Sequence, residues 1–119
     1  MAFLAAHLTD ARHYLCRKVG RATENPLGGV LEKGRTLDEL EPLPPIATIV
    51  SAWEAVSLHL MAVLDELDEA SLAQTGHRFP GTDGTLLGMA GFLAQHDSYH
   101  IGQMSLLRRQ LGLPAMMYI

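Results

Sequence analysis

TDGTLLGMAGFLAQHDSYHIGQMSLLRRQLG, residues 82–112, is the stretch that decides the fold. At about 100° per residue, its apolar residues gather on one face of a single long helix. His96 lies toward one edge of that face, and His100 lies near its middle. The segment therefore predicts a long amphipathic helix with two histidines one turn apart on its apolar side. The apolar positions are Leu86, Met89, Ala90, Leu93, Met104, Leu107 and Leu111.

The histidine pair points to metal binding. Burying an imidazole without a partner is costly, so each ring needs a hydrogen bond or a metal ion. A spacing of four residues directs two imidazoles at one ion, as in helical zinc sites. Buried histidines often serve structure alone, so a structural role stays open. Asp97, which stands where zinc proteases carry glutamate, is predicted to support a histidine ligand or to pair with another helix, with the ion pair favoured, and not to act as a base. Gln103 is expected either to orient a substrate or water or to bond a neighbouring helix.

Composition limits the class of protein. The 119 residues predict a single domain, 1–119, and 48% of them are apolar. This apolar content suggests that a partner subunit covers part of the surface. The net charge of −4 argues against nucleic-acid binding, which needs a basic face. A single cysteine fits a cytoplasmic protein. The sequence shows no signal peptide, and no apolar run is expected to be long enough to span a membrane.

Two further helices are predicted, over residues 2–19 and 45–70, from apolar residues at three- and four-residue spacing. The Gly- and Pro-rich segment 20–44 connects them, and Thr36 with Glu39 predicts one short helical turn within it. No strand pattern competes with these helices. The expected fold class is all-α, an antiparallel up-down helical bundle with three long helices in this chain, completed by dimerisation.

Other polar side chains are predicted to lie outside any site. His13, His59 and Arg12 fall off the apolar stripes of their helices: Arg12 is expected to be solvated, His13 to lie at the surface, and His59 to lie at a helix flank or at the surface. Cys16 is expected to be an inert thiol in the core or in an interface. On helix spacing alone, His7 is a partly exposed residue beside the apolar stripe.

The chain resembles the DinB-like family. Residues 92–112, FLAQHDSYHIGQMSLLRRQLG, are similar to the last helix of that family, with H-x-x-x-H, then I-G-Q and a basic, Leu-rich turn. LAAHLTDARHYL, residues 4–15, resembles the family's second helix, which carries a third histidine ligand; the matching position is His7. LPPIATIVSAWEAVSLHL, residues 43–60, is similar to its third helix. The family's first helix has no counterpart, which implies a naturally short member or a lost start, with an open groove that a second copy would cover.

The resemblance implies a four-helix bundle, commonly a homodimer, that holds a divalent metal ion, zinc or nickel, on His7, His96 and His100. Some members are thiol S-transferases or isomerases that use a low-molecular-weight thiol. The leading hypothesis is therefore a metal-dependent enzyme acting on a thiol and an electrophilic small molecule. The alternative is a non-enzymatic dimeric bundle with a structural or vestigial metal site. If the missing helix distorts the bundle, His7 would not reach the other two histidines.

Overall fold

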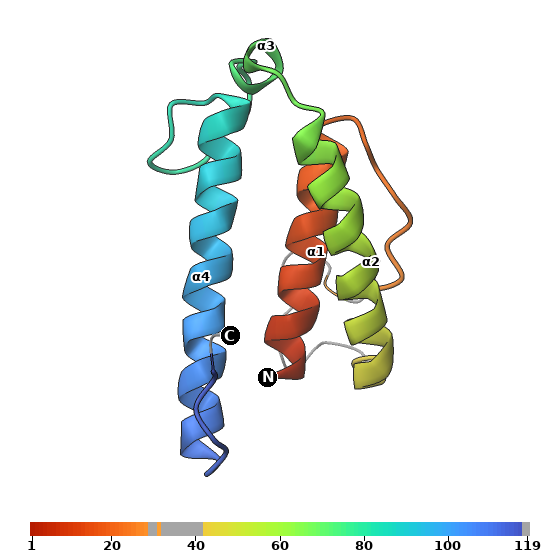
Figure 1. Ribbon diagram of the computed structural model, residues 1–119, viewed down its shortest axis with the longest axis vertical. Coiled ribbons are helices and arrows are strands. Elements are labelled where there is room, and N and C mark those ends of the chain that lie inside the picture. Colours follow the sequence, from red (N-terminus) through yellow and green to blue (C-terminus); the bar gives the residue numbers. More distant parts are fainter. Residues whose placement is uncertain (29–30, 32–41, 118–119) are drawn as a thin grey trace.

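The computed structural model describes residues 1–28, 31 and 42–117. Within these ranges the chain forms no strand, only an isolated bridge between Thr75 and Thr85. The all-α prediction is therefore confirmed. The helical turn predicted at Thr36 and Glu39 lies outside the described residues. The helices, shown in Figure 1, are α1 (Ala2–Lys18), α2 (Ile46–Asp65), α3 (Glu69–Leu72) and α4 (Leu86–Gln110).

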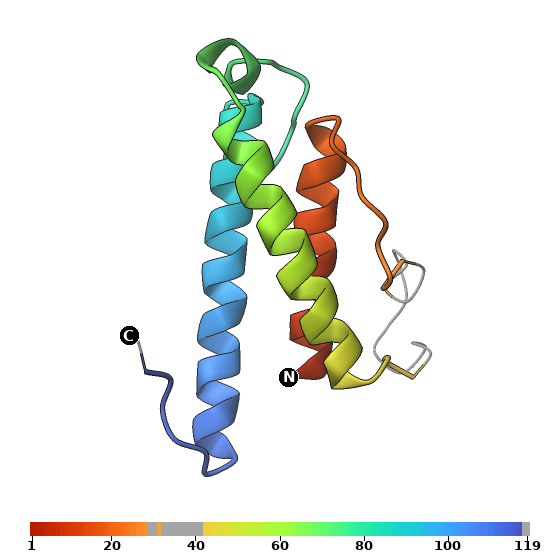
Figure 2. The same cartoon turned by 45° about the vertical axis from the view of Figure 1, so that its right-hand side comes forward.

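The three long helices do not simply alternate in direction. α1 and α2 pack side by side and run the same way, whereas α4 runs antiparallel to both (Figures 1 and 2). Side-chain contacts agree, because Arg12 bonds Ser57 midway along α2, and Arg21, beyond the end of α1, pairs with Glu66 just after α2. Residues 21–28, which belong to the connection that follows α1, run back alongside these helices, which fits this order (Figure 1).

The second predicted helix ends earlier than expected, at Asp65 instead of residue 70. Acidic side chains crowd this end, where they oppose the helix dipole. Asp68 then accepts a hydrogen bond from the Ser71 N–H and begins the short helix α3. The acidic run therefore separates two helices.

α4 begins at Leu86, later than the start that the predicted helical segment 82–112 implies. The cap is Thr85, whose hydroxyl oxygen accepts the N–H of Gly88. Asp83 holds the capping residue in place, because its carboxylate accepts hydrogen bonds from both the N–H and the hydroxyl of Thr85. The two side chains together fix where α4 starts.

The core consists of two small apolar clusters, and α1 contributes to both. The first joins α1 to α2 and to Leu27 of the connection, and the second joins α1 to the start of α4. These clusters hold the three long helices together toward opposite ends of α1. Their buried members are Ala6, Leu27, Ile49 and Ala52 in the first, and Leu15, Leu86 and Met89 in the second.

Much of the apolar face of α2 is exposed, although the sequence predicts it to be buried. Ile46 is 59% exposed, Val50 47% and Leu64 41%. The reason is that no helix within the described residues covers this face. The buried side chains of α2 are Ile49, Ala52, Val56 and Val63.

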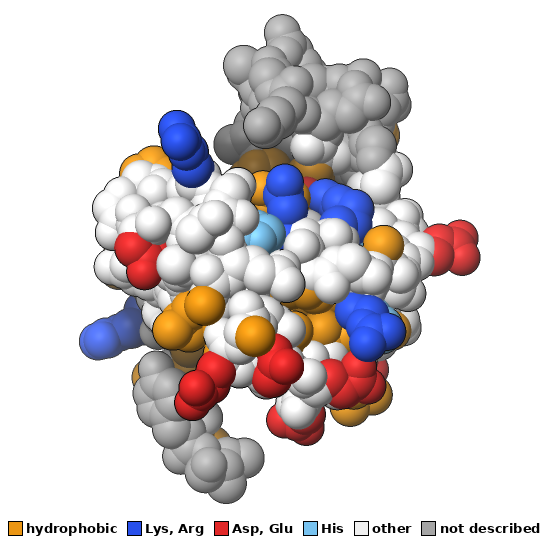
Figure 3. Space-filling view, turned by 90° about the horizontal axis from the view of Figure 1, so that it is seen from above, with side chains coloured by type: hydrophobic (Ala, Val, Ile, Leu, Met, Phe, Trp, Pro, Cys, Tyr) orange, Lys and Arg blue, Asp and Glu red, His pale blue; other side chains and the backbone are white. Residues whose placement is uncertain are grey.

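α2 is also long and apolar enough to cross a membrane, with a mean hydropathy of 1.6 and 28% of the window buried. The expectation that no run reaches this length is therefore wrong by length and composition. One such helix is weak evidence for a membrane protein, because core helices of soluble proteins pass the same test. Seen from the α3 end, apolar side chains reach the surface between acidic and basic ones (Figure 3).

Candidate metal centre

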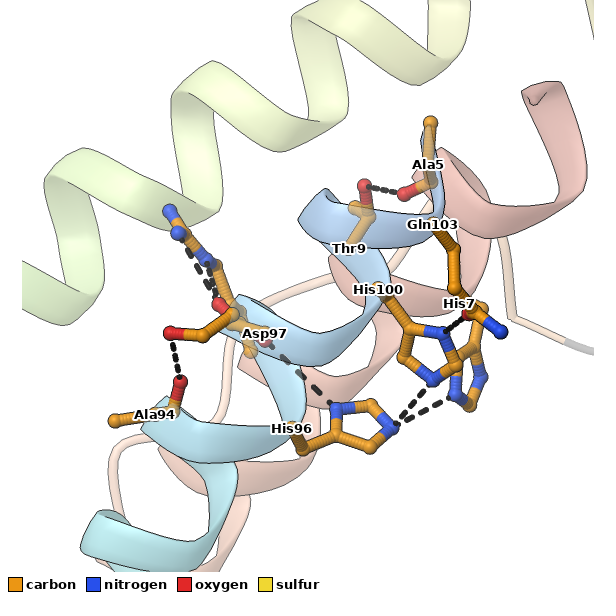
Figure 4. A network of polar contacts seen from close by, with 10 residues as sticks. Ala5, His7, Thr9, Ala94, His96, Asp97, His100 and Gln103 are labelled. Carbon is orange, nitrogen blue, oxygen red and sulfur yellow. Dashed lines mark hydrogen bonds and ion pairs between the residues drawn. The ribbon is translucent and has the colours of Figure 1, made fainter. Parts of the chain in front are cut away.

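Three histidines meet where α4 crosses α1. His7 comes from α1, and His96 and His100 come from successive turns of α4 (Figure 4). The Nε2 atom of His96 lies 3.0 Å from that of His7 and 3.1 Å from that of His100. All three rings are half-buried. His7 therefore reaches the other two histidines, and the expected distortion of the bundle does not separate them.

Hydrogen bonds alone do not satisfy these nitrogens. Nδ1 of His100 lies 2.5 Å from Oε1 of Gln103, so Nδ1 carries the ring proton and Nε2 keeps a lone pair. His96 Nε2 has one proton or one lone pair, yet it faces two nitrogens, and it can form a hydrogen bond with only one of them. A divalent cation bound between the rings would accept a lone pair from each of the three histidines.

The donor set suits a metal ion in chemistry and in size. The candidate ligand atoms of His7, His96 and His100 all lie within 4.8 Å of one another. In a tetrahedral zinc site with Zn–N bonds near 2.0–2.1 Å, two nitrogens are about 3.3 Å apart, which is close to the observed separations. These three histidines could hold a metal ion and would leave a fourth position for water or a substrate atom.

The surroundings keep two of the rings neutral. Burial lowers the pKa of His7, and the nearby His96 and His100 rings lower it further. Burial also lowers the pKa of His96, with His100 as the next cause. A metal binds imidazole through its lone pair, so the neutral form is the one that binding requires.

Aromatic side chains surround the triad. The Phe3 ring lies parallel to that of His7, with 6.0 Å between the centroids. The Tyr99 ring centroid is 5.1 Å from that of His100, and Tyr99 is 63% exposed. A shallow groove of about 280 Å³ lies beside the site along α4. Its lining residues are Phe92, Gln95, His96 and Tyr99.

The prediction that Asp97 pairs with another helix is confirmed. Its Oδ2 atom accepts hydrogen bonds from Nε and Nη2 of Arg12, at 3.4 and 3.3 Å. Arg12 also donates to the Ser57 hydroxyl, and its guanidinium carbon lies 3.5 Å from the centre of the Trp53 ring. The expectation that Arg12 is solvated is therefore wrong. Local sequence carries no signal for this role, because Arg12 and Asp97 are 85 residues apart.

Gln103 does not bond a neighbouring helix as predicted, since its Oε1 contacts Nδ1 of His100 in its own helix, and its role in orienting a substrate or water stays a prediction. His13 is not at the surface as expected but 3% exposed, and neither of its ring nitrogens has a hydrogen-bond partner. It faces the core because α1 is covered on more than one side. His59 lies at a flank as predicted, and its Nε2 contacts the backbone oxygen of Arg21 at 2.8 Å.

Cys16 is fully buried, which agrees with an inert core thiol, and burial raises its pKa. A thiol in this state is a poor nucleophile. The histidine triad is therefore a better candidate for a catalytic or metal-binding role than Cys16.

Comparison with known proteins identifies one relationship. A family model described as the DinB superfamily matches residues 1–104, which is most of the chain. No curated protein and no solved structure matches the chain significantly.

Proposed function

Since the chain belongs to the DinB superfamily, we propose that it binds a divalent metal ion through His7, His96 and His100 and acts as a metal-dependent thiol S-transferase. The observation that carries this proposal is the convergence of three imidazole nitrogens that hydrogen bonds alone do not satisfy. Imidazole ligands suit zinc and nickel. The cosubstrate would be a low-molecular-weight thiol, and the second substrate an electrophilic small molecule.

The chain would contribute binding and orientation to such a reaction. A bound divalent ion supplies Lewis acidity, which favours the thiolate form of a thiol at neutral pH. Gln103 holds His100 with Nε2 directed inward. The groove beside His96, with Phe92 and Tyr99 in its walls, offers apolar contact to the electrophile. In the transfer, the thiolate sulfur bonds to the electrophilic carbon as a leaving group departs, and the thiol proton passes to solvent.

A structural metal site is the second candidate. The three histidines come from two helices, so an ion would link α1 to α4. In this alternative the protein is a non-enzymatic dimeric bundle, and its metal site either joins the helices or is vestigial. A fourth protein ligand would favour this role, whereas an exchangeable water or thiol at the fourth position would favour catalysis.

Elemental mass spectrometry of untagged protein after incubation with zinc and with nickel tests the proposal. We expect about one divalent ion per chain, lost in His100→Ala and retained in the control His59→Ala, whose ring lies outside the triad. Folded protein without metal would refute metal binding. Consumption of glutathione or cysteine with an aryl halide then tests the transfer, and loaded protein with no turnover for any thiol would support the structural role.

We also propose a homodimer in which a second copy covers the space between α2 and α4. Two grooves lie there, of about 330 and 270 Å³, and apolar side chains line most of both. On the adjoining surface of α2, Leu58 is 71% exposed and Met61 64%. Light scattering should give a dimer mass that Met61→Glu reduces to a monomer and that Glu54→Gln, an exposed change on the same helix, leaves unchanged. A monomer at all concentrations would refute the dimer.

The cytoplasm is the compartment that we propose. Cys16 has no second cysteine in the chain to pair with, and a metal-bound thiol cosubstrate needs a reducing environment. Nucleic acid is not a proposed partner, because the net charge of −4 opposes contact with phosphates.

A further inference from the structure

The ring of His96 has a second nitrogen whose role the triad does not explain. Nδ1 of His96 is buried and has no hydrogen-bond partner. The nearby acceptor is Oδ1 of Asp97, 3.9 Å away, and both side chains are about four-fifths buried. Figure 4 marks the approach of these two neighbouring side chains of α4 with a dashed line.

The closeness of Asp97 to His96 matters because of where the imidazole carries its single proton. A neutral imidazole carries one proton, and Nε2 must keep its lone pair if it is to bind a cation beside His7 and His100. The proton then lies on Nδ1, where a buried N–H needs an acceptor. The observed separation of 3.9 Å is longer than a normal hydrogen bond, so the ring must turn toward the carboxylate for the bond to form.

Contacts from all three long helices hold Asp97 in place for this role. Its other oxygen, Oδ2, accepts from Arg12 of α1, so Oδ1 is free to face the histidine. The Arg12 guanidinium lies over the Trp53 ring and donates to Ser57, both in α2. The Ser57 hydroxyl in turn donates to the backbone oxygen of Trp53. The carboxylate therefore has little freedom to turn away.

We propose that Asp97, held by Arg12, is a positioning residue that accepts the Nδ1–H of His96 and so directs Nε2 toward the other two histidines. This inference rests on the proposed metal site. It gives the two α4 histidines different supports, a neutral amide from Gln103 for His100 and a carboxylate for His96. Carboxylate partners of this kind fix ring orientation and raise ligand basicity, and their removal lowers metal affinity about 10–100-fold in other proteins.

Asp97→Asn is the decisive variant, because it preserves size and an oxygen for Arg12 while an amide N–H₂ faces His96. An N–H₂ group favours a lone pair on Nδ1 and so moves the ring proton to Nε2. We expect zinc affinity, measured by chelator competition, to fall about 10–100-fold. Asp97→Glu, which restores a carboxylate, should recover part of this loss. Asp10→Asn is the matched control, since it removes another half-buried carboxylate near His7 without touching His96.

Long-range ¹⁵N–¹H NMR of the His96 ring gives a readout that a purely structural role would not change. In metal-free wild type we expect the proton on Nδ1, and in Asp97→Asn on Nε2. Affinity equal to wild type in Asp97→Asn, or a proton on Nε2 in the wild type, would overturn the inference. The metal-free spectrum keeps the test valid if Asp97→Asn does not fold. It also separates this inference from the proposed function, because the proposed metal site fails if the wild type binds no metal and the proposed transfer fails if the loaded wild type turns over no thiol, whereas neither result depends on Asp97.

Discussion

Arg12→Ala tests how α4 is held to the other two long helices. The variant removes the pair with Asp97 and the stacking on Trp53. Arg12 and Asp97 are 23% and 19% exposed, so solvent partly screens the pair, and we assign it about 1–2 kcal/mol. Stacking of a partly desolvated guanidinium on an indole adds about 1–2 kcal/mol. The free energy of unfolding should therefore fall by about 2–4 kcal/mol, which corresponds to a decrease in Tm on the order of 10 °C.

Urea unfolding of the metal-free protein, followed by far-UV circular dichroism, measures this loss. Trp53 is the one tryptophan of the chain, so its fluorescence reports the loss of the stacked guanidinium in the folded state. Arg21→Ala is the control, because it breaks an ion pair with Glu66 whose side chains are 59% and 63% exposed. That pair should contribute less than about 1 kcal/mol. Equal losses in the two variants would refute the argument that burial makes the Arg12 contacts stabilising.

Three further predictions concern other positions. Burial lowers the pKa of His13 below its ordinary value of 6.5, so the unfolded chain binds more protons than the folded one in acid. The free energy of unfolding should therefore fall as the pH drops below about 6.5, and urea titrations of His13→Gln should show a shallower fall. Gly91→Ala should raise the free energy of unfolding by roughly 0.5–1 kcal/mol, because no atom approaches the added Cβ. Gly88→Ala should instead lower Tm, because its Cβ meets the Asp83 carboxylate that supports the helix cap. Cys16 should react with a disulfide reagent quickly in urea and slowly in the native protein, and fast native labelling would contradict its burial.

Helix existence was predictable because apolar periodicity is a local property. The segments 2–19 and 82–112 match α1 and α4 closely, although the cap of α4 moved to Thr85. The end of α2 was less predictable, since the acidic residues there allow either a frayed helix or a break, and the Asp68 cap decides for the break. The exposure of Val50 and Leu64 could not be anticipated from spacing, because a stripe does not show whether a neighbouring helix covers it.

The sequence by itself determined that this protein is all-α and that His96 and His100 share one side of its longest helix, because helical geometry relates residues four apart without reference to the rest of the chain. Resemblance to a known family added His7. Only the tertiary structure decided that His7 lies 3.0 Å from His96, that α1 and α2 run in parallel, and that Arg12 holds Asp97 beside the site. The approach of His7 to His96 and the Arg12–Asp97 pair depend on how α1 and α4 pack, and these partners lie more than 80 residues apart in the chain. The parallel course of α1 and α2 depends on contacts such as that of Arg12 with Ser57, 45 residues apart, so all three features lie beyond the reach of local pattern.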